Sequence, residues 1–377
     1  ALMETDGDMD KAVDWLREKG LAKAAKKSGR IAAEGMAYAT VIDGVGVVVE
    51  VNCETDFCAK SDLFVPFVKD IATCVAVNAP ADVDALMNCT YPGRELTVAE
   101  IMPEKVMSIG ENLQIRRFER YAENTSVAYV HAGGKIGVLV NLEVEGGIDA
   151  TTIGKDMAMQ IAALNPRFWD KSDVTEEILA EEQKILVAQM DNDEKMANKP
   201  QAVKEKIAAG KMNKFFEENC LLQQAFVKDG SMSVEQYANA AAKAEAKKRQ
   251  EAKAKEILDE FNNSDKTAET FGKLASKYTT DGGSAATGGL YENFPKGQMV
   301  KEFEDWAFDE KRVAGDVEIV KTTYGYHIMY FISKGLPQYL ASVKSAVESA
   351  KIEAVYDQME KDHKITVNEE FEKALSI

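Results

Sequence analysis

A two-residue turn signal, Asp43-Gly44, stands between two segments in which apolar residues alternate with polar ones. The segments are Met36–Ile42 and Val45–Val51, and a period of two is typical of half-buried strands. Both turn positions tolerate a positive φ, which a two-residue hairpin requires. The sequence therefore predicts an antiparallel hairpin in this region.

A second hairpin signal follows the same pattern, with Ser126–Ala132 and Lys135–Val144 around Gly133-Gly134. Between the two hairpins, Gln114–Tyr121 is a plausible third strand. Helix-like spacing covers residues 56–88 and 153–165. We therefore expect an α+β, multidomain protein in which antiparallel sheets form the core subdomains.

The first residues predict a short amphipathic helix over 8–20, with Gly20 as its stop signal. One helix of this kind cannot bury its own apolar stripe, so it needs partners. Residues 22–30 are rich in Lys, Ala, Gly and Ser, which favours a linker.

A helical hairpin is expected over residues 173–219. Asp173, with Glu176 three residues later, has the spacing of a capping box. Apolar residues then recur at heptad-like intervals, and Pro200 suits the first turn of a return helix. The short arms favour a protruding antiparallel pair over a long coiled coil.

Length and charge limit the class of protein. The 377 residues predict two or three domains, and 46 basic against 63 acidic residues give a net charge of −17. That sign disfavours nucleic acid and anionic membrane surfaces as partners. No segment approaches the ~18 consecutive apolar residues of a membrane span, and no signal peptide precedes the first helix. The five scattered cysteines indicate reduced thiols in a cytoplasmic protein.

Near residue 240 the composition shifts to Ala, Lys and Glu, which marks a domain boundary. We expect a helical remnant and linker over 1–27, a core domain over 28–242, a second domain over 243–336 and a helical tail over 337–377. The second domain is expected to hold a Gly/Ser/Thr loop, a short helix and a strand, at 279–289, 299–309 and Gly325–Ile332.

Ordinary catalytic signatures are absent from the sequence. None of the three histidines stands at metal-ligand spacing, so we expect no metal and no cofactor. Cys53 and Cys58 lack a neighbouring base or cation, which favours buried small side chains over nucleophiles. Asp56 suits a helix N-cap, and Phe57 beside it suits a rigid apolar wedge for a partner's pocket.

The segment around Asp56 resembles the signature of bacterial elongation factor Ts. The resemblance spans about residues 1–240. Further segments that carry it are Ile109-Gly110-Glu111-Asn112 with Ile115-Arg116-Arg117, His131-Ala132-Gly133-Gly134-Lys135-Ile136-Gly137-Val138-Leu139-Val140, Met159-Gln160-Ile161-Ala162-Ala163, and Gly210-Lys211-Met212 followed by Leu221 to Lys228.

That resemblance implies a nonenzymatic exchange factor that binds the GTPase elongation factor Tu and accelerates GDP release. It implies partner-binding roles for Thr55, Asp56, Phe57 and Gln160, the last of which lies near the position where some members have a contributing histidine. It would also make residues 1–27 the end of a helical docking module.

The later part of the chain resembles a parvulin-type peptidyl-prolyl cis/trans isomerase over about residues 250–335. The stretches that carry this resemblance are Leu274 to Asp281, Gly288-Gly289-Leu290, Gly297-Gln298-Met299-Val300-Lys301-Glu302-Phe303 and Thr323-Tyr324-Gly325-Tyr326-His327-Ile328. The resemblance implies a proline pocket lined by Leu290, Met299 and Phe303. It also implies a hydrogen-bonding network of Asp281, Thr322 and His327, with proline-containing peptides as partners.

This sequence departs from the parvulin pattern at one point. Parvulins begin with a strand that carries a His-Ile-Leu segment, and here an Ala/Lys/Glu helix is expected instead. Three interpretations follow: an exchange factor, an active prolyl isomerase or folding chaperone, or a truncated fusion in which neither activity is intact.

Overall fold

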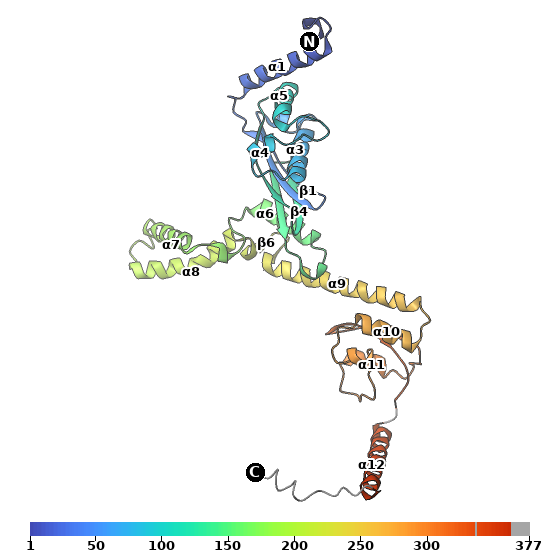
Figure 1. The fold of residues 1–377 in the computed structure, drawn as a ribbon. Coiled ribbons are helices and arrows are strands. Elements are labelled where there is room, and N and C mark those ends of the chain that lie inside the picture. Colours follow the sequence, from blue (N-terminus) through green and yellow to red (C-terminus); the bar gives the residue numbers. More distant parts are fainter. Residues whose placement is uncertain (336–337, 363–377) are drawn as a thin grey trace, which may run out of the picture. The chain divides into compact units, whose positions relative to one another are not determined.

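The computed structural model describes residues 1–335 and 338–362. They form two compact units, of which the first is Ala1–Ala246 and the second begins at Lys247 (Figure 1). The fold is multidomain and of the α+β class, as the sequence predicts, because helices accompany several small antiparallel sheets. None of the helices within the described ranges is long and apolar enough to cross a bilayer.

The first sheet has three antiparallel strands in the order β1-β2-β3. β1 is Glu34–Ile42, β2 is Val45–Cys53 and β3 is Gln114–Tyr121. At the turn between β1 and β2, Asp43 and Gly44 have φ values of 48° and 83°. The predicted hairpin and the predicted third strand are therefore confirmed.

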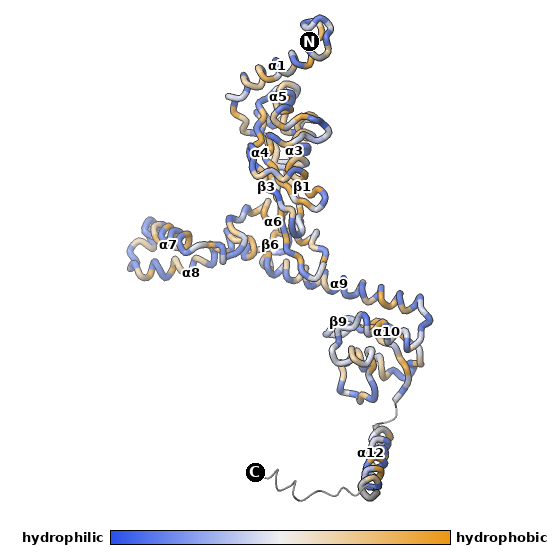
Figure 2. Tube along the Cα trace, in the orientation of Figure 1, coloured by the Kyte–Doolittle hydropathy of each residue, from blue (hydrophilic) through white to orange (hydrophobic). Residues whose placement is uncertain are grey.

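Three helices accompany this sheet: α3 (Phe64–Asn78), α4 (Val83–Met87) and α5 (Val98–Ile109). α3 packs on β1 and β2, and Figure 2 shows apolar residues gathered along it. α5 starts with a capping box between Thr97 and Glu100, which satisfies backbone donors at the helix start. The main core of the first unit lies between these helices and the sheet.

The second hairpin consists of β4 (Thr125–His131) and β5 (Ile136–Leu142), joined by residues 132–135. It packs directly on β1. The Ala37 N–H donates to the Gly134 carbonyl at 2.8 Å, and a Cβ on Gly137 would lie 2.8 Å from the Ala37 carbonyl oxygen. Position 137 therefore needs glycine for this close approach.

A smaller core lies beneath the second hairpin. α6 (Thr151–Leu164) packs across β4 and β5. β6 (Ala225–Phe226) and β7 (Asp229–Ser233) form a short pair beside it. Phe226 stacks on Tyr237 with ring centroids 4.0 Å apart, so the start of the next helix, α9 (Val234–Asn262), belongs to this core.

The first helix is longer than the sequence predicts. α1 spans Met9–Lys27, so the expected stop at Gly20 and the expected linker over 22–30 are wrong. Gly20 is buried inside the helix, where an added Cβ would lie 3.7 Å from the Pro103 carbonyl oxygen of α5. Packing of α1 on α5 therefore overrides the glycine signal.

Two neighbouring helices, α7 (Glu176–Asp191) and α8 (Gln201–Asn219), occupy the segment where a helical hairpin is expected (Figure 1). The expected capping residue is wrong. Thr175 caps α7 by accepting from the Ile178 N–H, whereas Asp173 belongs to a short 3-10 turn before it.

The second unit holds the end of α9 (Val234–Asn262), then α10 (Ala268–Tyr278) and α11 (Lys301–Ala307). Its sheet has two antiparallel strands, β8 (Val317–Thr322) and β9 (Gly325–Tyr330). The sequence predicts β9 but not β8. The last described helix is α12, Gln338–Asp362, and the expected tail beyond residue 362 lies outside the described residues.

Aromatic residues cover both faces of the β8–β9 sheet. On one face, Tyr330 packs with Phe261 of α9 and Phe271 of α10, with ring centroids 5.5 and 5.2 Å away. On the other face, Trp306 of α11 is buried against β8 and β9 and contacts Phe331. Because Phe261 is part of this packing, the helix expected in place of a His-bearing strand is an integral part of the second unit.

Candidate functional site

The Asp56-Phe57 pair lies on α2 (Asp56–Ala59), a single helical turn that follows β2. The Thr55 side chain caps this turn by accepting from the Cys58 N–H at 3.1 Å. Cys58 and Ala59 are buried, but Phe57 is 85% exposed. The turn is therefore anchored through one side while it presents a large apolar ring to solvent, and such a ring is a common feature of binding surfaces.

Asp56 lies at the surface beside this ring. Its carboxylate forms an ion pair with Lys60, at 3.2 Å, and both side chains are largely exposed. Exposed pairs of this kind contribute ~0–1 kcal/mol. The carboxylate is therefore easily released from Lys60 for a contact with a partner.

Two glutamates fix the backbone that carries this turn. The Glu111 carboxylate accepts from the N–H groups of Glu54 and Thr55, at 2.8 and 3.0 Å, and from the Thr55 hydroxyl at 2.7 Å. In return, the Glu54 carboxylate accepts from the Asn112 N–H at 2.7 Å. Burial acts to raise the pKa of Glu111, but these hydrogen bonds outweigh it and hold the pKa below its usual value.

Cys53 and Cys58 lie next to Glu111. Both are free and buried, which is the arrangement that the sequence favours for them, and burial raises the pKa of both thiols. Their sulfurs and a Glu111 oxygen lie within 4.8 Å of one another, so the three residues are potential metal ligands. The carboxylate is already committed to Glu54 and Thr55, however, and thiols of raised pKa are poor nucleophiles and ligands. These properties indicate that Cys53, Cys58 and Glu111 pack together to stabilise the turn, and they do not favour a metal centre.

Gln160 lies on α6 and is fully buried. Its amide nitrogen donates to Gln224 Oε1 and to the Ala225 carbonyl, each at 3.1 Å, and its oxygen accepts from the Val227 N–H at 2.8 Å. All of its hydrogen-bonding groups are thus used inside the first unit. In this structure Gln160 joins α6 to β6 and to the turn that follows it.

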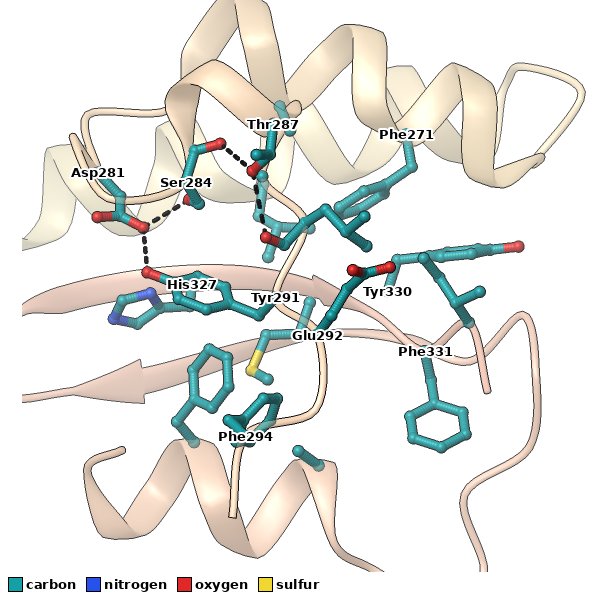
Figure 3. A pocket seen from close by; sticks show the side chains of 18 of the residues that line it. Phe271, Asp281, Ser284, Thr287, Tyr291, Glu292, Phe294, His327, Tyr330 and Phe331 are labelled. Atoms are coloured by element: carbon teal, nitrogen blue, oxygen red, sulfur yellow. Dashed lines mark hydrogen bonds between the residues drawn. The ribbon is translucent and has the colours of Figure 1, made fainter. Parts of the chain in front are cut away.

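A cavity in the second unit brings together several residues of the isomerase-like segment (Figure 3). Asp281 lies in the loop after α10, and its Oδ2 accepts from the Ser284 hydroxyl at 2.5 Å and from the Tyr291 hydroxyl. The Gly283 N–H donates to Oδ1 at 3.0 Å. The bonds from Ser284 and Tyr291 hold the pKa of Asp281 below its usual value, so the carboxylate is charged at neutral pH.

His327 projects from β9 into the same cavity. Its Nε2 shares a hydrogen bond of 2.9 Å with the Thr322 hydroxyl of β8. The Phe303 ring stands edge-on to the imidazole, with centroids 6.0 Å apart. Burial lowers the pKa of His327, and the negative charge of Asp281 opposes this shift. A neutral, hydrogen-bonded imidazole therefore lies beside an aromatic wall.

The remaining predicted pocket residues occupy different positions. Leu290 and Phe303 line the cavity, whereas Met299 is half-buried outside its lining. Tyr291 and Phe294 also line it, and both rings pack edge-on against Phe303. No motif in the sequence singles out these two aromatics, although they stand between the glycine loop and Met299.

Comparison with protein families divides the chain in two. Residues 54–258 match the model of the family described as "Elongation factor TS", and residues 234–333 match the "PPIC-type PPIASE domain". Residues 234–258, which lie in α9, fall within both matches.

Curated relatives agree with the first match. Elongation factor Ts of Halothermothrix orenii is 45% identical over 238 residues, which cover 62% of this chain and 78% of that protein. The Magnetococcus marinus protein of the same name is 43% identical over 246 residues, covering 64% and 80%. That of Clostridioides difficile is 44% identical over 248 residues, covering 65% and 80%. The chain therefore belongs to the elongation factor Ts family, and a PPIC-type peptidyl-prolyl isomerase domain overlaps the end of its elongation factor Ts region.

Proposed function

We propose that this protein binds the translational GTPase elongation factor Tu in the cytoplasm and accelerates its release of GDP. The observation that carries the proposal is the exposed Phe57, 85% accessible on a turn whose other side is buried. An aromatic ring held away from its own core fits a pocket on a partner.

The mechanism follows from differential binding. Phe57 and the Asp56 carboxylate would occupy space and place negative charge near the nucleotide's phosphate and Mg²⁺ site. Nucleotide contacts would then weaken only while the complex exists. By linkage, bound GDP must weaken binding of this protein to the same extent. No bond is made or broken in the exchange, so no nucleophile or cofactor is required.

The test is the release of a fluorescent GDP analogue from elongation factor Tu, with and without the full chain. We expect acceleration at micromolar concentration, and we expect Phe57→Ala to reduce it by about tenfold or more, the scale of a buried aromatic anchor. Phe303→Ala, in the second unit, is the matched control and should leave exchange unchanged. Absence of acceleration by the folded chain would refute the proposal.

We also propose that the second unit catalyses cis/trans isomerisation of peptide bonds that precede proline. The supporting observation is a cavity whose lining includes Phe303, Leu290, His327 and Asp281, with the Phe303 ring edge-on to the His327 imidazole. Rotation about a peptide bond has a barrier of ~18–20 kcal/mol in the absence of a catalyst.

An apolar wall can hold the proline ring while neighbouring polar groups favour the twisted amide over the planar one. Phe303 and Leu290 supply the wall, and the Thr322–His327 pair supplies the polar groups. This reaction rotates the chain about one C–N bond and neither forms nor breaks a covalent bond, so it needs no nucleophile.

The test is the isomerisation rate of a proline-containing tetrapeptide. The full chain should exceed the uncatalysed rate, and Phe303→Ala should remove the excess while Phe57→Ala retains it. A rate equal to the uncatalysed one, from a chain with a native thermal transition, would eliminate the isomerase. Failure of both this assay and GDP release would favour a fusion in which neither activity is intact.

A further inference from the structure

Glu111 joins two distant parts of the chain at the base of the Phe57 turn. It follows α5, whereas its three donor groups, the N–H groups of Glu54 and Thr55 and the Thr55 hydroxyl, lie immediately before α2. Hydrogen bonds to a charged acceptor are stronger than those between neutral groups. Glu111 is therefore the main polar tie between the α5–β3 loop and the segment that carries Phe57.

The tie is reciprocal and reaches the helix turn itself. Glu54, which donates to Glu111 through its N–H, accepts from the Asn112 N–H through its own carboxylate at 2.7 Å. Thr55, which donates its hydroxyl to Glu111, also accepts with that oxygen from the Cys58 N–H. The orientation of the Thr55 side chain is thus fixed from both sides. Loss of the Glu111 carboxylate would therefore also affect the Thr55 side chain that caps α2.

We propose that Glu111 is a positioning residue for Phe57, one that holds the exposed ring in its binding orientation before any partner arrives. This inference rests on the proposed exchange function and names a residue with no expected contact to the partner. An exposed aromatic on a loose loop loses conformational freedom when it binds, and this loss weakens affinity. With the loop already fixed by Glu111, that loss occurs during folding instead.

The inference predicts a particular kinetic pattern for Glu111→Ala. Once bound, Phe57 makes the same contacts in the variant, so the maximal GDP-release rate at saturating protein should stay within about twofold. The half-saturating concentration should rise by about tenfold, the size of one lost hydrogen bond to a charged group. Phe57→Ala, which removes the contact itself, should instead lower the maximal rate.

A double-mutant cycle separates positioning from general damage. The quantity compared is the initial slope of the GDP-release rate against the concentration of this protein. If Glu111 acts through Phe57, then adding Glu111→Ala to Phe57→Ala should lower this slope by less than about a further twofold. Glu111→Gln keeps the shape and one acceptor oxygen, and should recover most of the wild-type slope. Glu119→Gln removes an exposed carboxylate on β3 and serves as the control, with no expected effect. Losses that multiply in the double variant would overturn the inference.

Amide hydrogen exchange tests the positioning without any partner. Glu111→Ala should speed exchange at Glu54, Thr55 and Cys58 by about tenfold while the amides of α3 keep their wild-type protection. If the wild-type protein fails to accelerate GDP release but Glu111→Ala still exchanges faster at these amides, the proposed function is wrong and the positioning role stands. If Glu54 and Thr55 exchange equally in both proteins, Glu111 does not hold the turn and the inference is wrong.

Discussion

Replacing Gln160 with leucine tests whether this residue has a structural role. Leucine has a similar size, so the change leaves little empty volume and acts mainly on hydrogen bonding. Three groups lose their partner: Gln224 Oε1, the Ala225 carbonyl and the Val227 N–H. Each buried group left unsatisfied costs ~1–3 kcal/mol.

The burial of each of the three groups determines the total loss in the free energy of unfolding. The bond between Gln160 and Gln224 is buried, whereas the bonds to Ala225 and Val227 are only partly buried and water can replace part of each. We therefore expect Gln160→Leu to lower the free energy of unfolding of the first unit by ~3–5 kcal/mol. For a unit of this size, that loss corresponds to a decrease in Tm of roughly 6–20 °C.

The assay is urea unfolding followed by circular dichroism, with the midpoint and slope fitted for the transition of the first unit. Gln114→Leu, on an exposed position of β3, is the matched control and should change stability by no more than ~0.5 kcal/mol. A loss below ~1 kcal/mol for Gln160→Leu would refute the hydrogen-bond argument. A stable variant that has lost GDP release would instead return Gln160 to the partner surface.

Three further predictions concern other parts of the molecule. Gly137→Ala places a Cβ 2.8 Å from the Ala37 carbonyl oxygen, so thermal unfolding of the first unit should show a loss of ~1–3 kcal/mol. Thr97→Ala removes the capping box of α5 and should cost ~1 kcal/mol, measured by urea unfolding; an unchanged midpoint would contradict the cap. The pKa of His327 is lowered by burial, so the folded second unit binds fewer protons than the unfolded chain. Its stability should be constant above pH 7 and fall as the pH drops below about 6.5, by at most ~1.4 kcal/mol per pH unit, and His327→Gln should remove this dependence.

Local signals account for the parts of the fold that the sequence predicts well. The Asp43-Gly44 hairpin follows from two residues that accept a positive φ, and β3 lies in the segment predicted as a third strand. The length of α1 could not be predicted from local sequence signals. Its continuation through Gly20 depends on packing against Pro103, more than eighty residues away in the chain.

Among the candidate functional residues, some can likewise be identified from local sequence and others depend on contacts made in the folded structure. Phe57 could be identified from the sequence because Asp56-Phe57 stands in the segment that resembles the elongation factor Ts signature, and its ring is exposed in the structure. Glu111 is part of a recognised motif, yet its bonds to Glu54 and Thr55 join residues that only the folded structure brings together. Tyr291 was missed for the same reason, since its bond to Asp281 depends on how the loop between them folds.

α9 has a consequence for any attempt to divide this protein. Val234, at its start, is fully buried in a core of the first unit, and Phe261, near its end, is buried in the second. Both family matches include residues 234–258. A break anywhere in this stretch would therefore leave a truncated helix on each fragment. Separate expression of the two units calls for fragments that both retain the shared residues, since the start of α9 packs in a core of the first unit and its end packs in the second.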